Sequence, residues 1–366
     1  MVINNYSSKF ILLQLAYLVT AILIVALIYH PGLINERAGV INLTNFEGHK
    51  PFQYRIVVPL IVRGLDIVTP DIIKEKVDSL LEPKIANLKV ESEVSDNKIE
   101  LLSRYIYRSA VYICLNILSI FSFMVVFRRF SRLISGLPGI ISDLLPLGLV
   151  AIIPVFYLFP NYCYDFSHLF LLTLAMYYMY KREWLKYIIV YFFAILNKET
   201  VVLLTLLFLI YNWSELPRPQ LLKLAGIQFM IFAVIKGALF IIFRHNPGGF
   251  VEFHLQFNLK HLTKLANYVW FGIPPKGFLM PFPLNIPQPI GLNVICFAPV
   301  AFLVSYRWRE KPLFLRQAMI SLPILVFLTL FLGIIHELRD YYDVLPAVYI
   351  LATIGLYRVY TNHFQH

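Results

Sequence analysis

The sequence predicts an all-α integral membrane protein with about ten transmembrane helices. Two observations indicate this class: 59% of the 366 residues are hydrophobic while only 14% are charged, and the mean hydropathy is +0.69. Soluble domains carry about 25% charged residues, so the composition excludes an ordinary water-soluble domain, a disordered chain and a small disulfide scaffold. The apolar runs are continuous rather than alternating, which disfavours a membrane β-barrel.

A membrane-spanning helix needs about 20 apolar residues to cross about 30 Å of hydrocarbon, and ten apolar segments are interpreted as spans. They are residues 10–29, 110–127, 144–158, 166–180, 185–196, 201–211, 221–243, 290–306, 318–335 and 344–357. The first segment lacks a basic start and a small-residue cleavage site, so we expect a retained span and not a signal peptide.

Lysine and arginine clusters set the orientation that we expect. Much of the net charge of +11 is interpreted as orienting charge, and no nucleic-acid partner is expected. If every segment crosses once, four basic clusters and both termini fall on one side, which should be the cytoplasm. The clusters are Arg128, Arg129 and Arg132; Lys181, Arg182 and Lys186; Arg218 and Lys223; and Arg307, Arg309, Lys311 and Arg316. The absence of sorting signals favours a bacterial inner (plasma) membrane.

Residues 185–213 allow two interpretations. They form either one long helix or two short helices bent at Asn197-Lys198-Glu199-Thr200. A single helix would place Lys198 and Glu199 at mid-membrane and move the cluster from Arg307 to Arg316 outside, against the positive-inside rule. We therefore expect the bent pair.

The chain is expected to be one polytopic domain, 1–366, with two long outer loops. The first, 30–109, contains an apolar run at 56–62 that is too short to span and reads as an interfacial helix, followed by a charged stretch at 70–104. The second, 244–289, is rich in Pro and Gly and cannot be one continuous helix.

Five polar groups, far apart in sequence, fall on the face opposite the basic clusters. They are residues 36–55, 162–168 and 197–200, the second outer loop, and 336–340. Ionisable groups at membrane depth cost about 2.5–3.5 kcal/mol each, so they tend to be paired or functional. Each group also has a structural interpretation: Arg55 as an interface anchor, Asp165 as a helix cap, Lys198 and Glu199 as a local pair, and 336–340 as a hydrophilic turn.

The functional interpretation joins these groups into one site. Arg and Lys at the outer boundary suit a lipid phosphate or diphosphate, and a nearby carboxylate can act as general base towards an acceptor hydroxyl. A lipid-linked sugar phosphate presents both needs, because its tail lies in the bilayer and its leaving phosphate lies at the interface.

The layout and four short motifs resemble the C-type glycosyltransferase (GT-C) superfamily, and most of all its poorly characterised bacterial members. The motifs are Tyr54-Arg55 with Pro59, Tyr164-Asp165, Lys198-Glu199-Thr200, and Glu337-Leu338-Arg339. The resemblance implies a polyprenyl-phosphate sugar as donor and a catalytic acid in the first outer loop. Where the family usually carries an acidic pair there, this loop has isolated Glu36 and Glu47. Glu47 is the candidate base by position, with Asp165 in reserve.

The predicted function is transfer of a sugar to a glycan, lipid or protein acceptor on the extracytoplasmic face. Arg55, Lys198 and Arg339 would hold the phosphate and Glu199 and Glu337 would orient them, with His336 also in the predicted binding set. Neither a metal nor a cofactor is predicted, and the three cysteines are interpreted as packing residues. The alternatives are a transporter or flippase, a polymerase or ligase of lipid-linked glycans, and a scaffold subunit without chemistry.

Overall fold

The computed structural model describes residues 3–27, 35–91, 104–156, 162–272, 288–289 and 292–364, and the regular secondary structure of this part is helical apart from one two-residue strand pair. The all-α expectation is therefore confirmed. The elements are α1 (Ile3–Leu27), α3 (Val40–Asn45), η1 (Phe52–Tyr54), α4 (Val57–Val68), α5 (Asp71–Glu91), α7 (Ile106–Ile134), α8 (Gly139–Ile152), η2 (Ile153–Phe156), α9 (Asp165–Tyr180), α10 (Trp184–Asn197), η3 (Glu199–Val202), α11 (Leu203–Asn212), α12 (Arg218–Ile242), α13 (Leu255–Leu262), η4 (Leu265–Tyr268), β1 (Phe271–Gly272), β2 (Gln288–Pro289), α14 (Val294–Ser305), η5 (Trp308–Glu310), α15 (Leu313–Ala318), α16 (Ser321–Leu332), η6 (Leu338–Tyr341) and α17 (Leu345–Phe364).

Four stretches of the described chain are long and apolar enough to cross a membrane. They are Ser8–Leu27, Ile106–Ile134, Arg218–Ile242 and Leu313–Leu332, and shorter apolar helices accompany them. These helices identify a membrane protein, whereas the count of ten spans stays a prediction.

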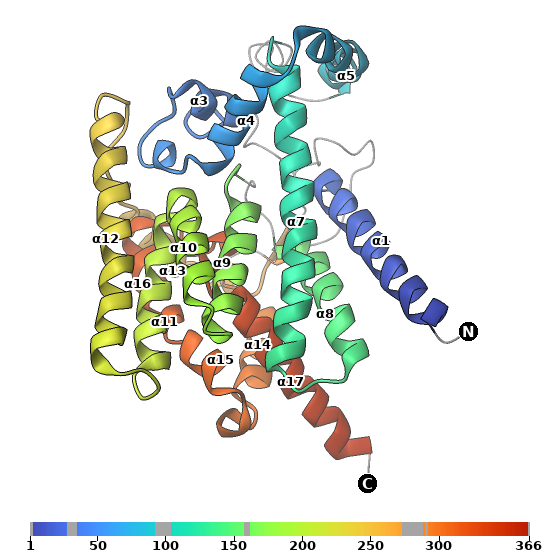
Figure 1. Ribbon diagram of the computed structural model, residues 1–366, viewed down its shortest axis with the longest axis vertical. Coiled ribbons are helices and arrows are strands. Elements are labelled where there is room, and N and C mark those ends of the chain that lie inside the picture. The colour runs from blue at the N-terminus through green and yellow to red at the C-terminus, as the bar shows by residue number, and fades with distance from the viewer. Residues whose placement is uncertain are drawn as a thin grey trace.

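The centre of the bundle is formed by α9, which packs along α7 and along α10 (Figure 1). The 29 residues of α7 extend about 44 Å at 1.5 Å per residue, and it runs through most of the molecule's height. Phe123, Phe127 and Phe130 lie one turn apart on its buried face. On peripheral helices the apolar side chains are exposed instead, which is the distribution that a surrounding bilayer requires.

The 185–213 segment is a bent pair, as expected. Lys198 adopts an extended conformation (φ −155°, ψ 139°) that ends α10, and the chain turns through η3 into α11. The two helices pack antiparallel, because Tyr187 stacks on Phe208 at 6.0 Å and the Tyr191 and Thr205 hydroxyls are hydrogen-bonded at 2.9 Å.

The basic segments gather at one end of the bundle. Phe314 of α15 makes edge-on ring contacts with Phe130, Tyr180 and Tyr211, and Arg182 pairs with Glu215 at 2.9 Å. These contacts join the ends of α7, α9, α11 and α15 at the lower end in Figure 1, where the C-terminus also lies. The basic clusters thus lie at one end of the molecule, as expected, and the side of the membrane that this end faces stays a prediction.

The two outer loops meet at the other end, where α3, α4 and α5 lie (Figure 1). Asn246 donates to the Phe46 and Gly48 carbonyls at 2.8 and 2.9 Å, and the Lys50 amide donates to the Pro247 carbonyl at 2.8 Å. Residues 35–56 and 244–254 thus form one cover, here termed the outer cap. The short run at 56–62 belongs to helix α4, as expected, and the charged stretch begins as helix α5; residues 92–103 and 273–287 lie outside the described chain.

Candidate functional site

A cluster of charged side chains lies beneath the outer cap, and its first part is centred on Glu199. The Arg55 guanidinium contacts both carboxylate oxygens, with Nη2 at 2.6 Å from Oε1 and Nε at 3.3 Å from Oε2. Lys236 of α12 approaches the same carboxylate, its Nζ lying 3.8 Å from Oε2. Three elements therefore supply one triad, here termed the Glu199 triad, in which two cations share one carboxylate.

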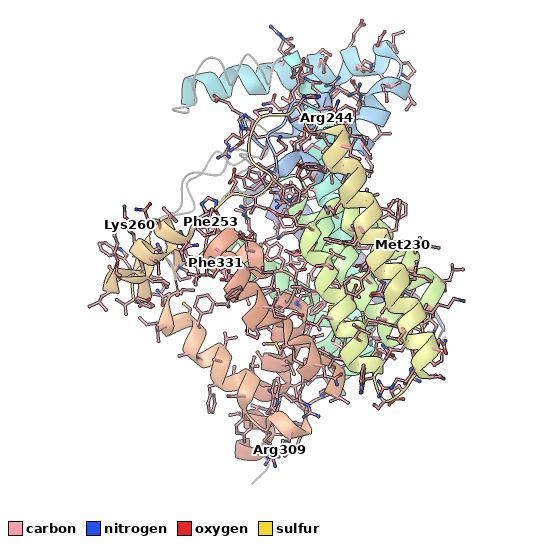
Figure 2. All side chains as sticks on the ribbon, turned by 90° about the vertical axis from the view of Figure 1, so that its left-hand side faces the viewer. Met230, Arg244, Phe253, Lys260, Arg309 and Phe331 are labelled. Carbon is pink, nitrogen blue, oxygen red and sulfur yellow. The ribbon has the colours of Figure 1, made fainter. Side chains whose placement is uncertain are left out.

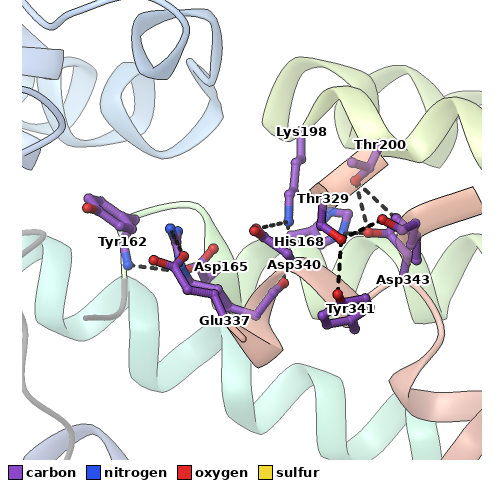
Figure 3. Close-up of polar contacts among 12 residues, drawn as sticks. Tyr162, Asp165, His168, Lys198, Thr200, Thr329, Glu337, Asp340, Tyr341 and Asp343 are labelled. Carbon is purple, nitrogen blue, oxygen red and sulfur yellow. Dashed lines mark hydrogen bonds and ion pairs between the residues drawn. The ribbon is translucent and has the colours of Figure 1, made fainter. Parts of the chain in front are cut away.

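The second part is centred on Arg339. Its Nε donates to Glu337 Oε2 at 2.7 Å, and its Nη1 lies 3.7 Å from Asp165 Oδ2. Asp165 begins α9 and also accepts the Tyr162 backbone amide at 2.8 Å (Figure 3). The side chains of Asp165 and Glu337 are 1% and 5% exposed, so this pairing takes place almost away from solvent. Here two carboxylates share one cation.

The remaining charges connect η3 to the segment before α17. Lys198 Nζ lies 3.9 Å from Asp340 Oδ1 and donates to the Arg339 carbonyl at 3.4 Å. Asp343 accepts the Thr200 hydroxyl at 2.9 Å and lies 3.2 Å from His168 Nε2, and Figure 3 shows these residues side by side. Charged groups from η3, α9 and the α16–α17 connection are thereby brought into one network.

Aromatic rings contact the two guanidinium groups. Arg55 lies over the Tyr164 ring at 4.2 Å and Arg339 over the Tyr162 ring at 4.3 Å. The two tyrosine rings are parallel, with an interplanar angle of 4°, and Phe52 stacks on Tyr162. Each contact is a cation–π or stacking interaction that restricts where an arginine can point.

Hydrogen bonds at the end of α10 explain why these segments meet. The fully buried Asn197 side chain at the end of α10 donates to the Tyr164 carbonyl at 2.9 Å and accepts the Ser167 hydroxyl at 2.8 Å. The Ile56 amide donates to the Leu196 carbonyl at 3.0 Å. The residue after Arg55 and the start of α9 are therefore both fixed to the end of α10, where Glu199 follows.

The ionisation of Glu337 is tuned by its surroundings. Burial raises the pKa of this carboxyl to about 7, against the opposing charge of Arg339, and the neighbouring Asp340 adds to the increase. A carboxyl with a pKa near neutrality can hold or release a proton at physiological pH, which suits acid–base chemistry.

The structure brings six of the eight predicted site residues together. Asp165, Arg55, Lys198, Glu199, Glu337 and Arg339 all belong to the cluster. Glu47 lies in the outer cap with an exposed side chain, and it forms no ion pair with a described residue. Its catalytic role stays a prediction.

The His336 ring lies outside the charged cluster and contacts the second outer loop. Its ring stacks on His261 of the second outer loop at 3.8 Å and lies 6.0 Å from Phe257. Burial lowers the pKa of His336 to about 4, and the His261 charge acts in the same direction. The imidazole is thus neutral at pH 7, and it does not add to the positive charge of the site.

Four further members of the cluster were not among the predicted site residues: Lys236, His168, Asp340 and Asp343. Lys236 carried a signal, as an ammonium within an otherwise apolar span, whereas Asp343 shows nothing in sequence beyond lying three residues after Asp340. Within the described residues, no group of three or more His, Cys, Asp or Glu side chains is arranged to hold a metal ion. Cys163 is buried, Cys296 is partly buried and Cys114 is exposed, and all three are free thiols.

In comparisons with known proteins, no family model, no curated protein and no solved structure matches this chain.

Proposed function

We propose that this protein is a membrane glycosyltransferase of the GT-C type, which moves a sugar from a polyprenyl-phosphate donor to an acceptor on the outer face. The observation that carries the proposal is the convergence of four cations, Arg55, Lys198, Lys236 and Arg339, with five carboxylates beneath the outer cap. Maintaining so many charges next to a bilayer is costly, and function is a common reason for that cost.

In the reaction, the bond between the sugar C1 and the phosphate oxygen breaks while a bond from C1 to the acceptor oxygen forms. The acceptor hydroxyl loses its proton to a carboxylate. The polyprenyl phosphate leaves with one more negative charge than it had in the donor. Cations held in place by carboxylates and aromatic rings can stabilise that charge without reorganising, which is the arrangement that lowers a barrier most.

We propose that the proton acceptor is one of two carboxylates predicted to lie on the outer face, Glu47 or Asp165. Glu47 lies in the first outer loop, and its exposed side chain is accessible to an acceptor that arrives from outside. Asp165 lies within the cluster but is 1% exposed and bound to Arg339 and to the Tyr162 amide. A Glu47→Gln variant that loses transfer but retains donor binding identifies Glu47 as the base, and the same result with Asp165→Asn identifies Asp165.

The test uses purified protein in liposomes with a set of polyprenyl-phosphate sugars and a membrane extract as the acceptor source. Release of polyprenyl phosphate is the readout, because it is common to every sugar and every acceptor. Arg55→Gln should lower the rate about 100-fold or more, as loss of a charge-stabilising donor does. Arg339→Gln should also lower the rate, because Asp165 and Glu337 would lose the cation that they share. Arg182→Gln removes an arginine from an exposed ion pair at the opposite end and should leave the rate unchanged.

Two results would contradict the proposal. Wild-type protein that binds no polyprenyl phosphate and releases none from any donor is not such a transferase. Protein that moves the intact donor lipid across the liposome membrane without releasing polyprenyl phosphate is a flippase instead.

A further inference from the structure

The Lys236 ammonium is the least satisfied charge of the cluster. Its nitrogen is fully buried, and it makes no hydrogen bond within the described part of the chain. Its ion-pair partner is Glu199, at 3.8 Å, which is beyond hydrogen-bond distance. A buried ammonium with unfilled N–H donors is costly, so the position is more easily explained by a partner that arrives than by structural stability.

Charge is distributed unevenly over the cluster. The Glu199 triad has two cations and one carboxylate, whereas the other part has Lys198 and Arg339 against four carboxylates: Asp165, Glu337, Asp340 and Asp343. An anion is therefore attracted to the triad and repelled from the other part. Glu199 is also accessible, with 38% of its side chain exposed against 11% for Arg55 and 14% for Lys236.

The triad lies next to a lipid-facing surface. The helix α12 forms one edge of the bundle in Figure 1, and it packs against η1, which precedes Arg55, and against η3, which begins at Glu199. On the same helix, Phe229 and Phe240 are seven residues before and four residues after Lys236, which places them on its side of the helix, and they are 51% and 48% exposed. The adjoining Met230, which Figure 2 shows between the helix ends, is 66% exposed. A phosphate attached to a long apolar tail can therefore reach Lys236 from the bilayer while its tail stays on α12.

We propose that Arg55 and Lys236 bind the phosphate of a lipid that approaches along α12, and that Glu199 is the counter-ion which this phosphate displaces. The inference rests on the proposed function, since it assigns the donor phosphate to one part of the site. Without lipid, Glu199 offsets one of the two positive charges and orients both cations. With lipid, the phosphate oxygens take over both contacts and fill the free donors of Lys236.

The experiment measures the affinity of the full-length protein in nanodiscs for undecaprenyl phosphate, for undecaprenol and for inorganic phosphate. Lys236→Met should weaken undecaprenyl phosphate binding about 10- to 100-fold, since a hydrogen bond to a charged group contributes about 1.5–3 kcal/mol. Lys236→Arg retains the charge and should stay within about 3-fold of wild type. Lys223→Met is the matched control, because it removes an exposed lysine from the opposite end of α12 and should change nothing.

The Glu199→Gln variant provides a test of sign. If Glu199 competes with the phosphate, its neutral substitute should bind undecaprenyl phosphate about 3- to 10-fold more tightly, since removing a competing charge favours the anion. Weaker binding by Glu199→Gln would show that Glu199 is needed in the bound state, and would overturn its role as a displaced counter-ion.

The outcomes separate this inference from the proposed function. If wild-type protein binds no undecaprenyl phosphate, the proposed function fails and this inference fails with it. If wild type binds it and Lys236→Met and Lys236→Arg bind equally well, only the present inference is overturned. Inorganic phosphate should bind at least about 100-fold more weakly than the lipid, because the tail adds buried apolar surface; equal affinities would identify a site for free phosphate instead.

Discussion

At the scale of single residues, the ionisation of each carboxyl in the cluster depends on which cation it contacts and on how many other carboxylates share that cation. Glu337 is 5% exposed and shares Arg339 with Asp165, so its ionised form is only partly compensated. Burial raises the pKa of its carboxyl from 4.5 to about 7. A carboxyl whose pKa is higher in the folded than in the unfolded protein makes folding less favourable as it ionises.

The predicted consequence is a loss of stability as the pH rises. Below pH 4.5 the Glu337 carboxyl is protonated in both states, and above about pH 7 it is ionised in both. Between these values wild type should lose about 2–3 kcal/mol relative to Glu337→Gln, which keeps an acceptor for Arg339 without the charge.

The measurement is the thermal unfolding midpoint in detergent from pH 4.5 to pH 8. Glu310→Gln is the control, because Glu310 is 53% exposed at the opposite end. Parallel pH profiles for wild type and Glu337→Gln would show that the pKa of the Glu337 carboxyl is not raised in the folded protein.

At the scale of elements, the connection between α16 and η6 depends on the second outer loop. Asn258 of α13 is fully buried, and its side-chain NH₂ lies within 2.9 Å of the carbonyls of Thr329, Leu330 and Gly333. Its side-chain oxygen accepts the Ile335 amide at 3.1 Å. One residue of α13 thus holds the segment that leads directly to Glu337 and Arg339.

We predict that Asn258→Ala loosens this connection. Removing the amide leaves buried backbone groups without partners, at about 1–3 kcal/mol for each group. The variant should lose about 2–4 kcal/mol of stability. Amide hydrogen exchange should become faster across residues 333–341.

The control for this effect is Asn362→Ala, since Asn362 is partly buried and makes one side-chain bond to Tyr306 at the other end of the chain. It should cost less than about 1 kcal/mol. Unchanged exchange at 333–341 in Asn258→Ala would show that α13 does not hold the connection.

At the scale of the whole molecule, the two ends of the bundle differ in charge and in cover. One end carries the basic clusters joined around Phe314, and the other carries the outer cap, with the charged cluster beneath it. Basic residues are retained on the cytoplasmic side, so the outer cap and the cluster should face outward.

Cysteine labelling tests this orientation. Ser79 of α5 and Ser214 between α11 and α12 are both exposed, at opposite ends of the molecule. In a variant without the native cysteines, expressed in bacterial spheroplasts, a membrane-impermeant maleimide should label Ser79→Cys at least about 10-fold faster than Ser214→Cys, because the bilayer excludes the charged reagent. After lysis both should react. Faster labelling of Ser214→Cys in intact spheroplasts would reverse the orientation.

Several features of the fold follow from local properties and were predictable from the sequence. The all-α class and the break at Lys198 follow from hydropathy, segment length and charge placement, which act within one helix or between neighbouring segments. The shared end of the basic clusters follows from the order of segments, and the contacts around Phe314 confirm it.

The composition of the site was predictable only in part. Arg55, Glu199, Glu337 and Arg339 were identifiable as costly charges on one face, but the pairing of Arg55 with Glu199 joins residues 144 positions apart. Lys236 joins the triad because the rotation of α12 directs it towards η3, whereas His336 stacks on His261 because α13 folds back over α16. The sequence by itself determined that charges gather at one face, since the bilayer penalises each of them individually. Only the tertiary structure decided which charges meet, because helix rotation and loop packing depend on contacts between segments distant in the chain.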